Sequence, residues 1–345
     1  MTRKLKRLIL HAAAGGLYYS GVLRLRSFFR RTILRKREIC ILSLHRVLSE
    51  EEASRANSLP GMVLKEATFA KMLEFLNRRF HVASLQDFLR AIENHQSDSR
   101  PWCLLTFDDG WRDNYTTAYP LLRKFQVPAT IFLVTGLIGT REVFWVEQLR
   151  RSWKNPLQRS QMNSVIAGIL PRQNGGRKIS LEEFIEFAKH MPSDDRSRLL
   201  KGLLLSDQPS EQTDGSDQMM NWDEVAELSR SGVEMGAHTV THPLLTHENS
   251  ATVRQEVRLS KKTLEENLTV KVRAFAYPNG DWNEKVREEV EQAEFRGAFT
   301  TQHGWYEHGG DLFAIPRVTL HEGKVTGLDG KFSPAMFSLT LARWR

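Results

Sequence analysis

The stretch that decides the fold is "LLTFDDGWRDNY", which runs from Leu104 to Tyr115. Its first half is an apolar run typical of a buried strand, and the run ends directly in two adjacent carboxylates, Asp108 and Asp109. Two like charges so close together repel one another unless a cation or a proton lies between them. The pair therefore indicates either an ordinary surface turn or a site built at the end of a strand.

Similar β-rich apolar runs, bounded by turns, recur along the chain and predict a series of strands. We expect these strands at 39–45, 80–84, 103–108, 129–135, 232–238, 273–278, 297–301 and 313–321. Segments of helical periodicity separate most of them, as in "NWDEVAELSRSG" (221–232). Strands that alternate with helices predict the α/β class with a largely parallel sheet.

The length of 345 residues suits one α/β barrel with insertions. A long polar stretch with helical patches interrupts the strand–helix alternation and predicts an inserted helical subdomain or cap. We therefore divide the chain into an N-terminal arm (1–37), a first barrel part (38–139), the insertion (140–218), a second barrel part (219–321) and a C-terminal tail (322–345).

The net charge of +8 is concentrated in the N-terminal arm. Residues 1–37 contain eleven basic residues and no acidic ones, so the rest of the chain carries 8 − 11 = −3. A mildly acidic body argues against nucleic-acid binding. The arm itself predicts contact with an anionic membrane surface as an interfacial amphipathic segment.

Two other interpretations of the arm remain open: an uncleaved anchor or export signal, and a basic helix packed on the barrel. Basic residues on both sides of the apolar stretch favour the cytoplasmic face of a membrane. Cys40 and Cys103 lie in apolar strand-like runs, which predicts buried free thiols and agrees with a reducing compartment. We expect a cytoplasmic protein at the inner membrane face, with export or N-terminal anchoring as the alternative.

Polar residues stand where several predicted strands end. His45, Asp108, His238 and His321 each close a separate run, and the run at 273–278 continues into "YPNG". Because the carboxyl ends of parallel strands meet at one rim, these residues are candidates for a common site.

"GAHTVTHPLL" carries His238 and His242 four residues apart. On one helical turn such a pair lies on a single face and can bind one metal ion. Asp109 would add the carboxylate of a two-His, one-Asp site, and the metal would offset the repulsion between Asp108 and Asp109. Asp108 would then be free to act as a general base.

The sequence resembles the NodB-like polysaccharide deacetylases. Three motifs carry the resemblance, in the family's order and spacing: "TFDDG" (106–110), "HTVTH" (238–242) and "FAYPNG" (275–280). The resemblance covers roughly residues 38–320 and implies a distorted (β/α) barrel of about seven strands. It also implies a hydrolase that acts on acetylated sugars.

The resemblance assigns roles to the motif residues. Asp108 would be the catalytic base, and Asp109, His238 and His242 would bind a divalent metal, most often zinc, with cobalt or nickel possible. The backbone N–H of Asn279 would stabilise the developing oxyanion.

Other residues of these motifs are further candidates for substrate contact. They are Tyr277 and Pro278, which precede Asn279, and Trp111, whose aromatic ring suits the face of a sugar.

The sequence departs from the family pattern in the third and later motifs. Ala276 stands where many members have an arginine that orients the base, so the base must be positioned differently here. The fourth motif has no clear match, and the fifth, which supplies the general acid, is matched only loosely by "VTLH" with His321. His45 in "LSLHRV" (42–47), similar to a subgroup's "YHRV", is the rival for the general acid.

Together these features predict a metal-dependent hydrolase that removes N-acetyl groups from amino sugars of a polysaccharide or lipid-linked glycan. Within the enzyme class, an O-acetyl esterase and a deformylase of a lipid-linked sugar also remain open. Outside it, the competing interpretation is a non-catalytic barrel that binds a glycan.

Overall fold

A computed structural model describes residues 2–29, 33, 38–93, 100–142, 144–169, 180–203 and 217–342. Its main sheet closes into a barrel, because β1 pairs with β11 on one side and with β5 on the other, all in parallel. The ring consists, in order, of β1 (Glu38–Leu44), β11 (Ile315–Thr319), β9 (Gly297–His303), β8 (Ala274–Ala276), β7 (Glu234–Ala237), β6 (Thr130–Leu133) and β5 (Trp102–Asp109). The predicted (β/α) barrel of about seven strands is confirmed.

Each run that predicts a strand forms one, with ends that differ by a few residues. Two short strands extend the sheet beyond the ring: β4 (His81–Ala83) lies parallel to β5, and β10 (Tyr306–Glu307) lies antiparallel to β1. A small separate ladder joins β2 (Arg46–Leu48) to β3 (Val63–Lys65). The strands β2, β3 and β10 were not predicted.

Side chains of the ring strands alternate between the barrel interior and the surrounding helices. On β5, Leu104 belongs to an interior apolar cluster with Phe132 and Phe299, whereas Leu105 and Phe107 belong to the cluster beneath the outer helices. Alternation therefore directs Thr106 and Asp108 inward above Leu104. The interior is apolar at the amino-terminal ends of the strands and polar at their carboxyl ends.

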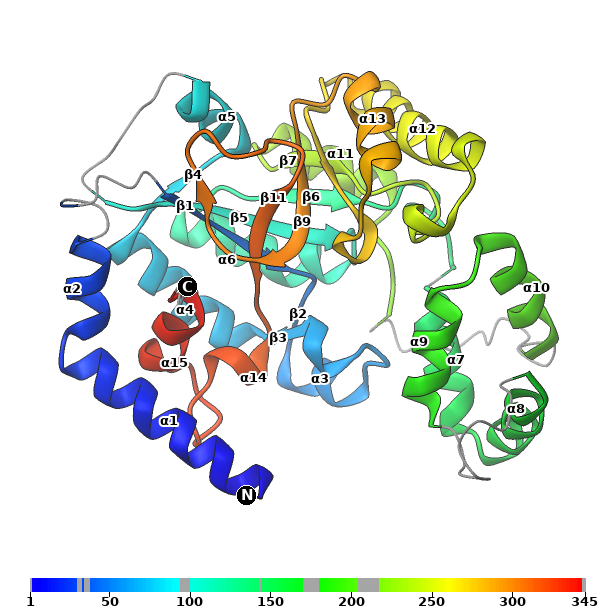
Figure 1. Cartoon of the computed structure of the whole chain (residues 1–345), viewed down its shortest axis with the longest axis horizontal. Coiled ribbons are helices and arrows are strands. Elements are labelled where there is room, and N and C mark those ends of the chain that lie inside the picture. Colours follow the sequence, from blue (N-terminus) through cyan, green and yellow to red (C-terminus); the bar gives the residue numbers. More distant parts are fainter. Residues whose placement is uncertain are drawn as a thin grey trace.

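Helices cover the outside of the barrel (Figure 1). They are α4 (Glu66–Arg79), α6 (Tyr119–Phe125), α11 (Trp222–Arg230), α12 (Ser250–Leu268), α13 (Glu284–Gln292), α14 (Glu322–Val325) and α15 (Pro334–Leu341). Asparagine side chains accept from the first free backbone N–H groups of α11, α12 and α13, which fixes where these helices begin. The short helix α3 (Glu50–Arg55) lies between β2 and β3.

Helix α5 (Leu85–Glu93) closes the amino-terminal end of the barrel. Phe88 packs against Phe299 in the interior cluster. At the start of β7 the carboxylate of Glu234 accepts hydrogen bonds from the backbone N–H groups of Leu85 and Gln86. In the described residues, α5 therefore fills the amino-terminal end of the barrel, opposite the carboxyl ends of the strands.

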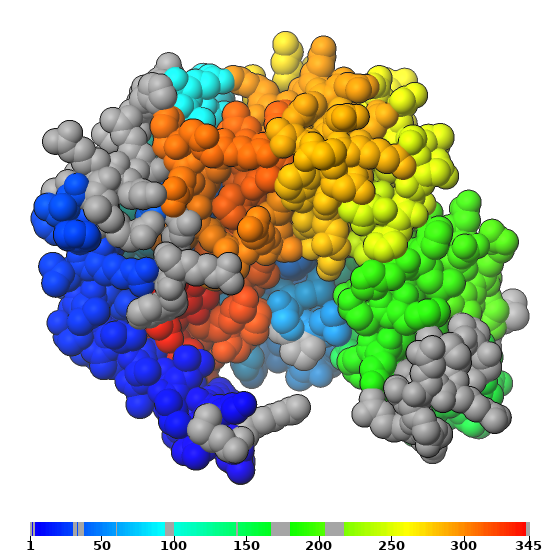
Figure 2. All heavy atoms as spheres, viewed as in Figure 1, coloured from blue at the N-terminus to red at the C-terminus, as the bar shows by residue number. Residues whose placement is uncertain are grey.

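The predicted insertion contains α7 (Trp145–Lys154), α8 (Pro156–Ile169), α9 (Leu181–Lys189) and α10 (Ser193–Leu203). These helices share an apolar cluster of their own, centred on Leu149 and Phe184. They form the green lobe beside the barrel in Figures 1 and 2. The Ser193 backbone N–H, which donates to the Glu248 carboxylate, links the lobe to the barrel. Most of the loop predicted at 206–218 lies outside the described residues.

The N-terminal arm forms two helices, α1 (Arg3–Tyr19) and α2 (Val22–Phe28). Ala14 of α1 is buried against Ala335 and Met336 of α15. Figure 1 shows α1 and α2 along one side of the barrel, far from the insertion. Within the described residues, no helix is long and apolar enough to cross a membrane.

Candidate active site

The carboxylates of the opening stretch lie at the carboxyl end of β5, and both are almost completely buried. Asp109 has φ 80°, so the strand alternation ends there and its side chain is redirected toward the site. Gly110 follows with φ 89°, and a side chain there would collide with Leu133. This glycine allows the turn that separates the two carboxylates.

Asp109, His238 and His242 converge as predicted. Oδ1 of Asp109 lies 3.7 Å from Nε2 of His238 and 3.7 Å from Nε2 of His242, and the two ring nitrogens are 3.2 Å apart. All three donor atoms lie within 4.8 Å of one another. Imidazole nitrogens and a carboxylate form a donor set that suits zinc and similar divalent metals.

The two histidines do not lie on a helical turn, and that part of the prediction is wrong. They belong to the loop after β7, in which His242 has φ 59°. The carboxylate of Glu256, on α12, accepts the backbone N–H groups of Val240 and Thr241 at 2.7 and 2.9 Å. This buried carboxylate holds the loop in the conformation that brings both rings to Asp109.

The orientation of His238 is set by the carbonyl oxygen of Ala276, 2.7 Å from Nδ1. Because a carbonyl only accepts, Nδ1 carries the proton and Nε2 offers its lone pair toward Asp109. Burial lowers the pKa of His238 to about 4, and burial together with the neighbouring His238 lowers the pKa of His242 to about 3. Both rings are therefore neutral at neutral pH, as metal binding requires.

Trp111 holds the remaining oxygen of Asp109. Its indole Nε1–H donates to Oδ2 at 2.9 Å, which leaves Oδ1 facing the two histidines. The Trp111 ring is fully buried, so the expectation that it contacts a sugar is wrong. The ring packs instead between the guanidinium of Arg46, 4.2 Å from its centroid, and Phe144.

Arg46 continues this supporting layer below the site. Its buried guanidinium pairs with Asp113 at 2.9 Å and with Asp217 at 2.6 Å. These contacts join β2, the segment after β5 and the end of the insertion. Trp111 thus holds the ligand Asp109, and Arg46 in turn packs on Trp111. Metal ligands in proteins are usually held in place by outer residues of this kind.

Asp108 is held by an arginine that the sequence did not predict. Arg317 of β11 is fully buried and donates from Nη1 to Oδ1 at 2.7 Å and from Nη2 to Oδ2 at 2.8 Å. Burial would raise the pKa of Asp108, but the charge of Arg317, the nearby His238 and the hydrogen bonds of Arg317 outweigh it and hold the pKa well below its usual range. Arg317 therefore orients Asp108, the predicted base, in a chain whose third motif has Ala276 in place of an arginine.

The two candidates for the general acid differ in their relation to Asp108. His45 contributes electrostatically to the lowered pKa of Asp108, and its buried Nδ1 has no hydrogen-bond partner among the described residues. His321 begins α14, and its pKa is lowered by burial and by Lys324. In the described part of the chain, no hydrogen bond or ion pair joins the His321 side chain to the residues above.

Only one of the three residues predicted around the oxyanion position is exposed. Tyr277 is fully buried and its hydroxyl donates to the carbonyl of Phe313, while Pro278 is buried in the turn. Substrate contact through these two side chains is therefore wrong. Asn279 is exposed at the rim with φ 58°, and Thr301 fixes the turn by donating to its carbonyl oxygen at 2.7 Å.

The insertion contributes two residues that sequence reasoning missed. The half-buried ring of Phe144 lies edge-on to His242, with centroids 5.2 Å apart. Glu147 of α7 is buried, its Oε1 has no hydrogen-bond partner in the part of the chain that the structure describes, and burial with the charge of Asp109 raises its pKa to about 8. The insertion therefore forms one wall of the site.

A family model described as polysaccharide deacetylase matches residues 95–166 and 205–298. These segments contain all three motifs and flank the middle of the insertion. The chain is also similar to YxkH of Bacillus subtilis (strain 168), which is provisionally named a polysaccharide deacetylase. The two are 20% identical over 290 residues, and the alignment covers 84% of this chain and 76% of YxkH.

Solved structures have the same fold. The Streptococcus pyogenes deacetylase PplD in complex with acetate aligns with a TM-score of 0.58 at 20% identity, over 89% of this chain and 99% of that one. A de-N-acetylase from Aggregatibacter actinomycetemcomitans aligns with a TM-score of 0.56 at 15% identity, over 88% and 100%. At these identities the likeness establishes the barrel fold.

Proposed function

We propose, from the premise that this chain belongs to the polysaccharide deacetylase family, that it is a metal-dependent hydrolase removing N-acetyl groups from amino sugars of a polysaccharide or lipid-linked glycan. The proposal rests on the observation that two adjacent carboxylates, Asp108 and Asp109, have different partners. Asp109 faces His238 and His242, while Asp108 is held ionised by Arg317. One carboxylate is thus prepared to bind a cation and the other to accept a proton.

Asp109, His238 and His242 would hold the metal, and their donor atoms fit it. A divalent cation there, such as zinc, would polarise the acetamide carbonyl and stabilise the charge that develops on its oxygen. The reaction needs the other residues to move protons and to position the substrate.

Asp108 would accept a proton from the attacking water as that water adds to the carbonyl carbon. The backbone N–H of Asn279 would donate to the developing oxyanion, in a turn fixed by Thr301. Collapse of the tetrahedral intermediate breaks the carbon–nitrogen bond, and the departing nitrogen takes up a proton. The products are acetate and a free amino sugar.

His45 is the better candidate to return that proton. Its charge acts on Asp108, and its Nδ1 lacks a partner, whereas His321 has no polar contact with the site among the described residues. His45→Ala should therefore reduce kcat by roughly 10²-fold or more, and His321→Ala by much less. The opposite order would assign the general acid to His321.

The central experiment compares the wild-type protein with Asp108→Asn and Asp109→Asn. N-acetylated amino-sugar oligosaccharides serve as substrate, acetate release is measured, and metal content is determined by elemental analysis. Asp108→Asn should retain the metal and lose activity, whereas Asp109→Asn should lose both. A wild-type protein that binds no metal and releases no acetate would support the non-catalytic glycan-binding barrel.

Formate and acetate release from matched substrates distinguishes the N-deacetylase from a deformylase and from an O-acetyl esterase. Release from an N-formyl sugar only would indicate a deformylase, and release from an O-acetyl sugar only would indicate an esterase. The ring of Phe144 borders His242, so we expect this wall of the site to influence which acyl group is accepted.

A further inference from the structure

A cavity lies at the opposite end of the barrel from the candidate active site. It has a volume of about 340 Å³ and opens between α2, the carboxyl end of α4, and α15. Glu38, which begins β1, and Pro101, which precedes β5, line it, so it lies at the amino-terminal ends of the strands. A molecule bound there cannot be the group that reacts at Asp108.

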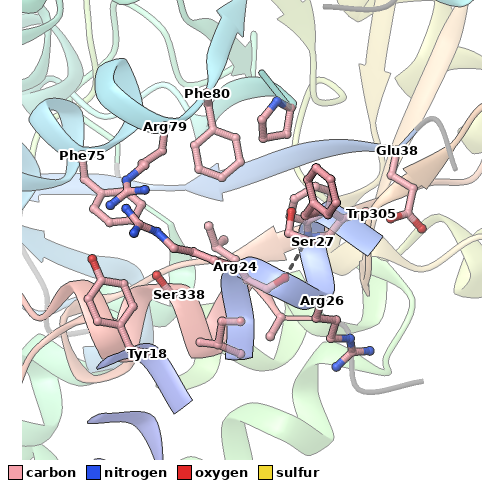
Figure 3. Close-up of a pocket in the computed structure, with 15 residues that line it drawn as sticks. Tyr18, Arg24, Arg26, Ser27, Glu38, Phe75, Arg79, Phe80, Trp305 and Ser338 are labelled. Atoms are coloured by element: carbon pink, nitrogen blue, oxygen red, sulfur yellow. Dashed lines mark hydrogen bonds between the residues drawn. The ribbon is translucent and has the colours of Figure 1, made fainter. Parts of the chain in front are cut away.

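The cavity joins an apolar wall to the side chains of three arginines, Arg24, Arg26 and Arg79 (Figure 3). Phe75, Phe80, Trp305 and Leu341 supply the wall. Arg24 of α2 and Arg79 of α4 line the same cavity, and in Figure 3 both guanidinium groups point to the Phe75 side. The guanidinium carbon of Arg79 lies 5.9 Å from the Phe75 ring centroid.

Arg24 and Arg79 have no acidic partner among the described residues. Glu38 also lines the cavity, but Figure 3 shows it at the end away from the Arg24 and Arg79 guanidinium groups, on the Trp305 side. Two like charges on one cavity wall without a counter-charge favour an anionic ligand. The adjoining apolar wall favours a ligand that also carries a hydrocarbon part.

The surface around the cavity indicates where such a ligand would come from. Most of the large exposed apolar side chains of the described chain lie on the arm, among them Leu8, Ile9, Leu25 and Phe28, each about half exposed or more. Lys4, Lys6 and Arg7 are interspersed with them, and residues 1–37 contain no acid. A surface of this composition binds in the plane of an anionic bilayer.

We propose that this cavity binds one anionic phospholipid of the membrane on which α1 and α2 lie. Arg24 and Arg79 hold the phosphate, and an acyl chain lies along Phe75, Phe80 and Trp305. The arm brings the protein to the membrane, and the cavity distinguishes an anionic lipid from a general negative surface. This site is independent of the proposed deacetylase reaction.

The test uses the full-length protein and co-sedimentation with vesicles of phosphatidylcholine, with or without phosphatidylglycerol. Arg79→Gln and Arg24→Gln should each weaken binding to the anionic vesicles by roughly tenfold. The matched control is Arg78→Gln, an exposed neighbour on α4 that does not line the cavity, and it should weaken binding by less than about threefold. Equal losses in Arg78→Gln and Arg79→Gln would overturn the proposal in favour of diffuse attraction.

A second measurement does not depend on the arginine variants. Short-chain phosphatidylglycerol with a brominated acyl chain should quench the tryptophan fluorescence of the wild-type protein, because Trp305 lines the cavity. The same lipid should not quench the fluorescence of Trp305→Phe, which comes from the remaining tryptophans. Equal quenching in the two proteins would overturn the proposal. The proposal would also be overturned if inorganic phosphate fully displaced the lipid from the protein. A dimer that forms through this face, in a protein that does not bind vesicles, would overturn it as well.

Discussion

Arg317 and Asp108 form a two-point ion pair at 2.7 and 2.8 Å, wholly inside the barrel and 209 residues apart in the sequence. The Arg317 side chain also donates to the carbonyl of Thr300 and to the hydroxyl of Thr106, so its plane cannot rotate. A rigid guanidinium fork fixes both the charge and the direction of the carboxylate it pairs with. The direction in which the Asp108 carboxylate points is therefore set by β11, which is separated from β5 by β1 in the ring.

Arg317→Met should lower kcat by about 10²-fold or more and move the acid limb of the pH–rate profile to higher pH. The depressed pKa of Asp108 keeps the base ionised throughout the mildly acid range. Without Arg317 the burial that raises this pKa is opposed only by His238 and His45, so protonation begins at higher pH. Activity measured from about pH 4 to 9 on one substrate tests this.

Arg317→Lys separates charge from geometry in the same assay. Lysine keeps the charge but not the fork, so the acid limb should stay near the wild-type position while kcat recovers only in part. Arg254→Met removes an arginine that pairs with Glu289 on the surface, and it should leave the profile unchanged. An unshifted acid limb in Arg317→Met would contradict the role assigned to this arginine.

Trp111→Phe should weaken metal binding by about 10–100-fold while leaving the fold intact. Phenylalanine fills most of the same space but lacks the Nε1–H that holds Oδ2 of Asp109. The affinity is measured by competition with a chromophoric chelator. Trp153→Phe, in the insertion and away from the three ligands, should retain wild-type affinity.

Glu147→Gln should change how stability depends on pH. The pKa of Glu147 in the folded protein, about 8, lies well above its ordinary value of 4.5. The stability gained from its neutral form is therefore complete below about pH 4.5 and is lost as the pH rises through 8. With a chelator present, wild-type Tm should fall more steeply than that of Glu147→Gln between about pH 5 and 8. Parallel Tm curves would show that Glu147 is ionised in the folded protein.

Much of the barrel could be predicted because its strands are short apolar runs separated by amphipathic helices. The rim could be predicted because parallel strands bring their carboxyl ends together, which placed Asp109 near His238 and His242. Both inferences use local patterns and one topological rule.

What could not be predicted depends on pairings between distant residues. Arg317 lies in an expected strand, but nothing nearby in the sequence identifies Asp108 as its partner. The only local indication of a special role for Arg317 is that it is a charged residue within the apolar run at 313–321. Likewise, the loop at His238 owes its conformation to Glu256, and the burial of Trp111 depends on packing that the tightly spaced motif does not show.

Gly280→Ala should disable the turn that presents Asn279. Gly280 has φ 82°, and an added Cβ would overlap Thr301, which holds the Asn279 carbonyl. Gly330 has a similar φ of 74° but open space around it, so Gly330→Ala isolates the backbone cost of about 1 kcal/mol. Because only Gly280→Ala displaces the oxyanion donor, it alone should lower kcat, by roughly 10²-fold. Steady-state kinetics beside thermal unfolding separate the two effects, and equal kcat values in both variants would exclude Asn279 from the reaction.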